Sequence, residues 1–275
     1  GLSIAARGWG PDDGPPVLAV HGWLDNAASF DRLAPLLPEL RIVAIDLPGH
    51  GWSDHRSPDA QYLFVDYVLA LARIVDALSW DHFSLVGHSM GASAAALTTG
   101  AIPERVEHLA LIEGITPLTC PGDQAAERAG RSIEGNHRYA STPARVYPSL
   151  EDAVERYRGS HPAMSDAAIH LLVERGTHAV DGGYAFRYDR RLKAPSMLRL
   201  DEEQAISFLR RIDCPTIVIQ GDEGLPFGPD DVAWGVEQIS GARHFVVPGG
   251  HHVHLDAPEV VASHIRGLFG LPDVP

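Results

Sequence analysis

Hydrophobic and polar positions along the chain alternate between two patterns. Six short apolar runs have the length of β-strands and end at a glycine or a polar turn; they cover residues 16–22, 40–49, 83–89, 106–114, 214–221 and 243–250. Stretches with helical spacing lie between them, at 28–38, at 61–79, after residue 89 and at 258–269. Because near-continuous apolar runs suit strands covered on both faces, the pattern predicts an α/β fold with a mostly parallel, doubly wound sheet.

One long region breaks this alternation. Between residues 117 and 205 no good strand pattern occurs, and the composition becomes polar, charged and helical, as in 149–160 and 165–180. A structureless connection of this length would be unusual. We therefore expect an inserted helical cap at 117–205, folded over the carboxyl ends of the strands, where open α/β sheets bind ligands. Residues 1–116 and 206–275 then form the core domain.

Composition and charge narrow the classes of partner. The 275 residues are 45% hydrophobic, which is enough for a sizeable core, and the net charge of -14 opposes binding to nucleic acid or to an anionic membrane. No apolar run is long enough to cross a membrane, and the first residues do not resemble a signal peptide. The two cysteines, Cys120 and Cys214, favour buried thiols over a disulfide framework. We expect a cytoplasmic protein that binds small molecules, and the sequence leaves its oligomeric state open.

A candidate nucleophile lies at the end of the third predicted strand. The pentapeptide Gly-His-Ser-Met-Gly at 87–91 follows the run FSLV and precedes an alanine-rich segment. By itself this pattern also fits an ordinary turn, but between a strand and a helix it is typical of a nucleophile elbow that projects the Ser89 hydroxyl. The N–H of Met90, the next residue, would supply one donor of an oxyanion hole. Serine alone is a poor nucleophile, so the chain must also supply a base and an acid.

Further motifs support a family resemblance. HGWL at 21–24 follows the first predicted strand, DLPGHGWSD at 46–54 follows the second, and the serine pentapeptide follows the third. Over essentially its whole length the chain resembles enzymes of the α/β-hydrolase fold, and HGWLDNAASFDRLAPLLP with DLPGHGWSD resembles the serine hydrolase-like group of capped, esterase-like proteins. The resemblance implies a cofactor-free Ser-His-acid triad. By resemblance to other His-Gly-x loops, it also implies that the Trp23 N–H is the second oxyanion donor. Candidate substrate-pocket residues are His21, Gly22, His88, His252 and Phe227.

The base is expected near the C-terminus, where the chain reads GGHHVHLD. This run offers His251, His252 and His254. Family members place Gly-His, a short apolar stretch, an acidic residue and Pro-Glu before the last helix, which implies His251 as the base and His252 as the second choice. The His-His-x-His spacing can also suggest a metal site, but no second ligand group accompanies it, so we expect no metal.

The acid departs from the usual family pattern. Most relatives read Gly-x-x-Asp after the penultimate strand, whereas residues 221–224 read Gly-Asp-Glu-Gly. Some relatives carry the acid at the end of the preceding strand instead, where this chain has Glu113. A glutamate that closes so apolar a run is expected to be buried, and a buried carboxylate needs a partner such as imidazole. We expect Glu113 to be the acid, with Asp222 as the alternative and Glu223 as a further one.

These features predict a serine hydrolase that cleaves a small carboxylic ester through an acyl-enzyme. By analogy, the serine at the elbow excludes sister families that form an ester on an aspartate there. Three alternatives remain: cofactor-free acyl transfer or perhydrolysis, cleavage of a carbon-carbon bond on the same triad, and a ligand-binding protein of this fold without catalysis.

Overall fold

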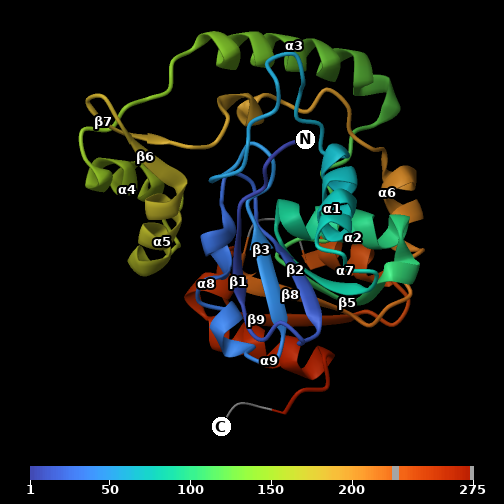
Figure 1. Cartoon of the computed structure of the whole chain (residues 1–275). Coiled ribbons are helices and arrows are strands. Elements are labelled where there is room, and N and C mark those ends of the chain that lie inside the picture. The colour runs from blue at the N-terminus through green and yellow to red at the C-terminus, as the bar shows by residue number, and fades with distance from the viewer. Residues whose placement is uncertain (225–228, 273–275) are drawn as a thin grey trace.

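The fold is built on a seven-stranded sheet (Figure 1). In this computed structural model the described residues are 1–224 and 229–272, without the side chains of 229–231. The strand order is β1-β3-β2-β4-β5-β8-β9, and among the described pairings of this sheet only that of β1 with β3 is antiparallel. The strands are β1 Ala6–Trp9, β2 Pro16–Val20, β3 Arg41–Ile45, β4 Phe83–His88, β5 Val106–Ile112, β8 Thr216–Glu223 and β9 Arg243–Gly250. This confirms the predicted mostly parallel sheet.

The six predicted apolar runs correspond to β2, β3, β4, β5, β8 and β9. Strand β1 was not predicted, because this short edge strand is mostly exposed and lacks an apolar run. The helical spacing at 28–38 was misleading, since the segment forms two 3₁₀ turns, η1 Ala27–Phe30 and η2 Ala34–Leu36. Pro35 and Pro38 each lack a backbone N–H, which works against a continuous α-helix there.

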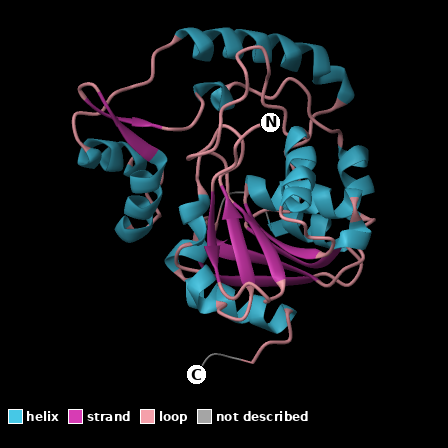
Figure 2. Ribbon diagram, viewed as in Figure 1, coloured by secondary structure: helices cyan, strands magenta, loops and turns pink. Residues whose placement is uncertain are grey.

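Helices cover both faces of the sheet (Figure 2). Helices α1 Asp66–Ala77, α2 Met90–Ala101 and α7 Pro229–Glu237 share one hydrophobic core with the sheet, and α9 Pro258–Leu268 shares the other with η1 and η2. The short helix α8 Val253–Asp256 precedes α9. Successive strand residues alternate between the cores: Leu18 belongs to the first and Ala19 to the second. This two-sided burial explains why the strands read as continuous apolar runs.

The region between β5 and β8 holds most of the remaining elements. They are η4 Gly122–Gln124, α3 Ala125–Ser141, α4 Leu150–Arg158, α5 Asp166–Gly176, β6 Thr177–Val180, β7 Gly183–Phe186, η5 Arg190–Lys193 and α6 Glu202–Leu209, and a further turn, η3 Pro103–Arg105, precedes β5. Figure 1 shows α3 arching above the core while α4, α5, β6 and β7 lie to one side. Side chains of Ser149 and Asp201 cap α4 and α6, each in a reciprocal capping box.

Two details of this region differ from the sequence expectation. An antiparallel hairpin, β6 with β7, occupies a stretch where no strand was expected. The sequence feature that could have predicted this hairpin is Asp181-Gly182, a dipeptide typical of two-residue hairpin turns. Gly182 has φ +83°, a conformation that such turns require. In addition, the expected boundary at 205 falls inside α6, which packs against α2 of the core.

Cys120 and Cys214 are free and buried. None of the helices in the described part of the chain has both the length and the apolar character that a bilayer crossing requires.

Candidate active site

Ser89 occupies a sharp turn between β4 and α2. Its backbone has φ +52° and ψ −117°, a conformation that residues other than glycine rarely adopt. The flanking glycines are required by close packing: a Cβ at Gly91 would lie 2.1 Å from the Val20 carbonyl oxygen, and one at Gly87 would lie 2.5 Å from the Ala92 Cα. The local geometry is therefore that of a nucleophile elbow.

Three distant segments meet at this turn. The Nε2 atom of His251, which follows β9, lies 3.0 Å from the Ser89 Oγ, and its Nδ1 lies 3.0 Å from Glu113 Oε2. Glu113 follows β5, and its side chain is only 2% exposed, against 17% for His251. The structure thus brings together the serine, the histidine and the preferred carboxylate that the sequence singled out.

The carboxylate of Glu113 is held by the neighbouring strand. Its Oε1 accepts a hydrogen bond from the Gly221 N–H, and its own N–H donates to the Ile219 carbonyl oxygen at 2.9 Å. A Cβ at Gly224 would lie 2.4 Å from Glu113 Oε2. The glycine at the usual position of the acid therefore leaves the space that the Glu113 carboxylate fills.

The alternative acids lie elsewhere. Asp222 and Glu223 are both exposed, and Asp222 Oδ1 accepts a hydrogen bond from the Gly249 N–H at 2.9 Å. Neither carboxylate has a hydrogen bond or ion pair with His251 in the described structure. The contact geometry therefore favours Glu113.

Burial and the carboxylate have opposite effects on His251. Burial, the larger effect, lowers the pKa of His251 below its usual value, and the hydrogen bond to Glu113 raises it in part. The net lowering keeps the imidazole neutral near pH 7, which is the form that can accept a proton from serine.

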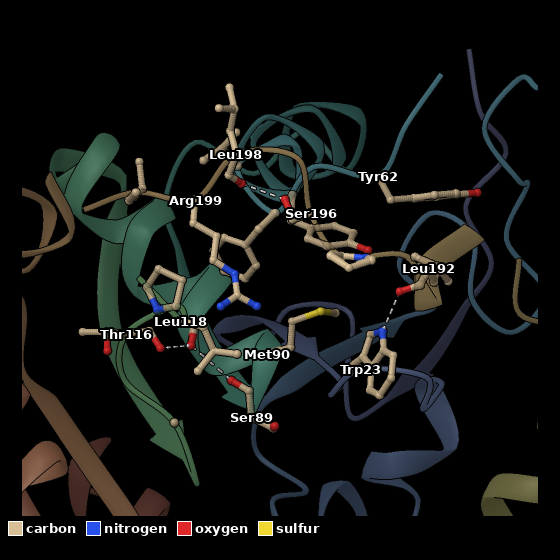
Figure 3. A pocket seen from close by; sticks show the side chains of 18 of the residues that line it. Trp23, Tyr62, Ser89, Met90, Thr116, Leu118, Leu192, Ser196, Leu198 and Arg199 are labelled. Carbon is tan, nitrogen blue, oxygen red and sulfur yellow. Dashed lines mark hydrogen bonds between the residues drawn. The ribbon is translucent and has the colours of Figure 1, made fainter. Parts of the chain in front are cut away.

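The two proposed oxyanion donors border a cavity of about 550 Å³ (Figure 3). The Met90 N–H opens α2 and the Trp23 N–H follows β2, and neither donates to an acceptor among the described residues. Trp23 is 52% exposed as a residue, and its Nε1–H donates to the Leu192 carbonyl oxygen at 3.1 Å. The cavity is lined mostly by apolar side chains and has Ser89 in its wall.

The core and the region between β5 and β8 both contribute residues to the wall of this cavity. The core supplies residues around Trp23, Ser89 and the start of α1, and the region between β5 and β8 supplies 114–118 and most of 192–200. The latter residues were not predicted, because no sequence pattern indicates which part of a long insertion faces the site.

Most of the predicted pocket residues lie behind the cavity. His21, Gly22, His88 and His252 are not among the described residues that line it. The Nε2 atom of His21 accepts a hydrogen bond from the Leu47 N–H at 2.9 Å, so this buried side chain joins two loops. Phe227 lies outside the described residues.

The three histidines of the His-His-x-His run face different partners. His251 contacts Ser89, His254 Nε2 lies 2.7 Å from the Ser29 Oγ, and His252 Nε2 lies 3.4 Å from Asp25 Oδ2. The run therefore does not converge on one point.

Asp25 is the centre of a second, largely buried network that sequence reasoning missed. The Tyr157 hydroxyl donates to Asp25 Oδ1 at 2.9 Å, and His88 Nδ1 lies 3.6 Å from Oδ2. Burial opposes ionisation of Asp25, but His252 and His88 outweigh it and hold the pKa of Asp25 well below its usual value. Ligand atoms of Asp25, His88 and His252 lie within 4.8 Å of one another, so among the described residues this trio has the spacing to hold a metal ion. Its observed contacts are structural: His88 Nε2 lies 2.9 Å from the His251 carbonyl oxygen, which steadies the loop that carries His251.

Comparisons with known proteins agree with this fold and geometry. A family model described as alpha/beta hydrolase fold matches residues 15–141. A serine hydrolase-like protein from Danio rerio is 36% identical over 272 residues, which cover 95% of this chain and 83% of that protein. A hypothetical protein from Pseudomonas aeruginosa PAO1 superposes with a TM-score of 0.92 at 43% identity, over 98% of this chain and 96% of the other. The thioesterase domain from the curacin biosynthetic pathway superposes with a TM-score of 0.84 at 28% identity, over 96% and 95% of the two chains.

The fold is therefore that of the α/β-hydrolases. Within that class the chain belongs to the serine hydrolase-like proteins, and these relationships support a hydrolase.

Proposed function

We propose that this protein is a serine hydrolase that cleaves a small carboxylic ester through an acyl-enzyme. The observation that carries the proposal is the unbroken line of contacts from Glu113 through His251 to Ser89, with the serine in the wall of a mostly apolar cavity. A carboxylate, an imidazole and a hydroxyl in this order make an activated nucleophile.

In the first half-reaction, the Ser89 Oγ attacks the acyl carbon of the ester while His251 Nε2 takes the hydroxyl proton. Glu113 accepts the hydrogen bond of the Nδ1–H, which selects this tautomer and stabilises the imidazolium that forms. The imidazolium then donates the same proton to the departing alkoxide, and Ser89 keeps the acyl group. In the second half-reaction, water attacks the acyl carbon while it loses a proton to Nε2. The bond to Ser89 Oγ then breaks, the imidazolium returns the proton to this oxygen, and the acid leaves the restored enzyme.

The negative charge that develops on the acyl oxygen requires hydrogen-bond donors. Met90 and Trp23 line the cavity together with Ser89, and their backbone N–H groups supply two such donors in this mechanism. In comparable sites, removal of one oxyanion donor costs about 3 to 4 kcal/mol of transition-state stabilisation.

We assign residues 117–205 the role of a lid on this site. Trp23 Nε1–H donates to the Leu192 carbonyl, and Arg175 Nη2 lies 2.7 Å from Asp46 Oδ2, so polar contacts, these two among others, hold the region to the core. These contacts support a lid that shields the acyl-enzyme from bulk water and shapes the acyl site.

The contact between Glu113 and His251 also supports an enzyme over a ligand-binding protein of the same fold. The sequence feature that most favours a non-catalytic protein is Gly224, which stands where most relatives carry the acid. In this chain the Glu113 carboxylate fills the space beside Gly224, so a glycine there accompanies an intact set of catalytic groups.

Labelling with a fluorophosphonate, followed by peptide mapping, tests the nucleophile. We expect one adduct, on Ser89 rather than on Ser93 or Ser196, which also line the cavity. Ser89→Ala should abolish both labelling and hydrolysis of p-nitrophenyl acetate while changing the melting temperature by only a few degrees. Absence of an adduct in the folded wild-type protein, or hydrolysis retained by Ser89→Ala, would contradict the proposal.

A further inference from the structure

A guanidinium group enters the mostly apolar cavity from the region between β5 and β8. Among the described residues that line the cavity, only Glu113, Lys193 and Arg199 carry charged side chains. Figure 3 shows Arg199 pointing into the cavity, toward the side on which Ser89 and Met90 lie. A cation in this position faces the space that the substrate must occupy.

Arg199 differs from three arginines of this protein that are largely withdrawn from solvent and paired with a carboxylate. Arg175 pairs with Asp46 at 2.7 Å, Arg191 with Asp189 at 2.6 Å and Arg266 with Glu39 at 2.7 Å. By contrast, Arg199 has no ion pair and no hydrogen-bond acceptor within the described part of the chain, although it is partly buried. Partial burial of a guanidinium without a carboxylate costs free energy. An anion that enters the cavity would therefore be stabilised by an ion pair with Arg199.

The other charged groups of the cavity do not neutralise Arg199. Both carboxylate oxygens of Glu113 are engaged, one by His251 and the other by the Gly221 N–H. Lys193 Nζ lies 4.8 Å from the centroid of the Tyr188 ring.

The surroundings of Arg199 add positive charge. Burial, reinforced by the nearby Arg128 and Arg131, lowers the pKa of Arg199. The guanidinium remains charged at neutral pH, because an arginine side chain starts from so high a pKa. Of these two neighbours, Arg131 is paired with Glu127 at 3.6 Å, whereas Arg128 has no ion pair among the described residues.

We propose that the substrate of this site carries an anionic group, in the simplest case a carboxylate, that binds Arg199 while its ester carbonyl lies at Ser89. The inference rests on the proposed function, since it names the class of ester. The planar guanidinium can form two parallel hydrogen bonds to a carboxylate or to two oxygens of a phosphate or sulfate, which fixes both position and orientation. Arg199 is then a specificity-determining residue.

The first test compares charged and neutral esters of the same shape. The acyl arm uses p-nitrophenyl monoesters of succinate, glutarate and adipate against the same compounds with the free carboxylate methylated. The leaving-group arm uses butyrate esters of 4-hydroxybenzoate and 4-hydroxybenzenesulfonate against the methyl ester of the former. We expect kcat/KM to favour the anionic member in one arm by about 10- to 100-fold, the usual range for a charged hydrogen bond. The favoured arm identifies the side of the ester that carries the anion.

Variants then assign this preference to Arg199. Arg199→Gln should reduce the anionic-to-neutral ratio of kcat/KM by about 10- to 100-fold, and Arg199→Lys should restore part of it, because the charge returns without the planar fork. The matched control is Arg138→Gln, which removes the same charge from an exposed position of α3 that does not line the cavity. This control should keep the wild-type ratio.

A binding measurement separates this inference from the catalytic proposal. Ser89→Ala protein should bind glutarate or adipate by calorimetry, and the double variant with Arg199→Gln should bind at least about 10-fold more weakly. Binding that depends on Arg199 without any ester hydrolysis would support the anion site and reject the hydrolase. Hydrolysis with equal preference for neutral and anionic esters in the wild type and Arg199→Gln would overturn the anion site and leave the hydrolase intact.

Discussion

The ends of β5 and β8 offer acidic residues at the same edge of the sheet, yet only one of them reaches the histidine. The two strands are parallel neighbours, and Glu113 follows the first while Asp222 lies near the end of the second. Glu113 turns inward through a left-handed backbone conformation, φ +54°, and contacts His251. Asp222 remains exposed and accepts a hydrogen bond from the Gly249 N–H.

The comparison shows which of two neighbouring strand ends supplies the carboxylate that contacts the histidine. Both strand ends approach the loop that carries His251, so the position of the carboxylate depends on which of them leaves room. A Cβ at Gly224 would collide with the Glu113 carboxylate. The observed position of this carboxylate therefore requires a glycine at 224.

Exchange of the two carboxylates for amides gives the largest expected difference. Glu113→Gln keeps the shape of the side chain but removes the charge that stabilises the imidazolium, so kcat/KM for an aryl ester should fall by about 10³- to 10⁴-fold. Asp222→Asn should remain within about 3-fold of the wild type, as expected for an exposed residue away from the triad. Steady-state kinetics on both variants, with melting temperatures as a check of folding, decides between them; the reverse ranking would make Asp222 the acid.

A methyl group added at Gly224, just after β8, should displace the carboxylate of Glu113, just after β5. Gly224→Ala places a Cβ about 2.4 Å from Glu113 Oε2, so the carboxylate must move away from His251 or the loop must shift. We expect kcat to fall by about 10- to 100-fold, because loss of the carboxylate altogether gives a larger loss.

The control for this substitution is Gly130→Ala on α3, where an added Cβ meets no atom within 4 Å. This variant should keep the wild-type kcat in the same assay. If Gly224→Ala matches it, the space beside Gly224 has no bearing on the acid.

The pH dependence gives the smallest and most specific difference between the two strand ends. Burial lowers the pKa of His251 below its usual value of about 6.5, and the neutral form acts as the base. The kcat/KM of the wild type should therefore be fully present above this pKa and decline only as the pH falls through a midpoint below about 6.5. Glu113→Gln should move the midpoint of its residual activity lower, because the Glu113 hydrogen bond raises the pKa of His251. Asp222→Asn should leave the midpoint in place, and a shift in that variant would link Asp222 to His251.

The local features of this protein follow from the sequence by itself. Continuous apolar runs predict β2, β3, β4, β5, β8 and β9, because a strand buried on both faces must be apolar along its whole length. The turn at Ser89 is equally local, since Gly87 and Gly91 allow a close approach of neighbouring backbones. The prediction of secondary structure failed at two short segments. Strand β1 is an exposed edge strand without an apolar run, and prolines divide the predicted helix at 28–38 into 3₁₀ turns.

Tertiary structure decided what depends on the relative placement of distant segments. The choice between Glu113 and Asp222 required the directions of two side chains on neighbouring strand ends, and in a strand a shift of one residue turns a side chain to the opposite face. The same holds for His252 and Arg199, since one turned toward the buried Asp25 and the other into the cavity. A sequence pattern records which residues are buried, but the atoms that face each other across a site are determined only when the strands, the loops and the region between β5 and β8 pack together.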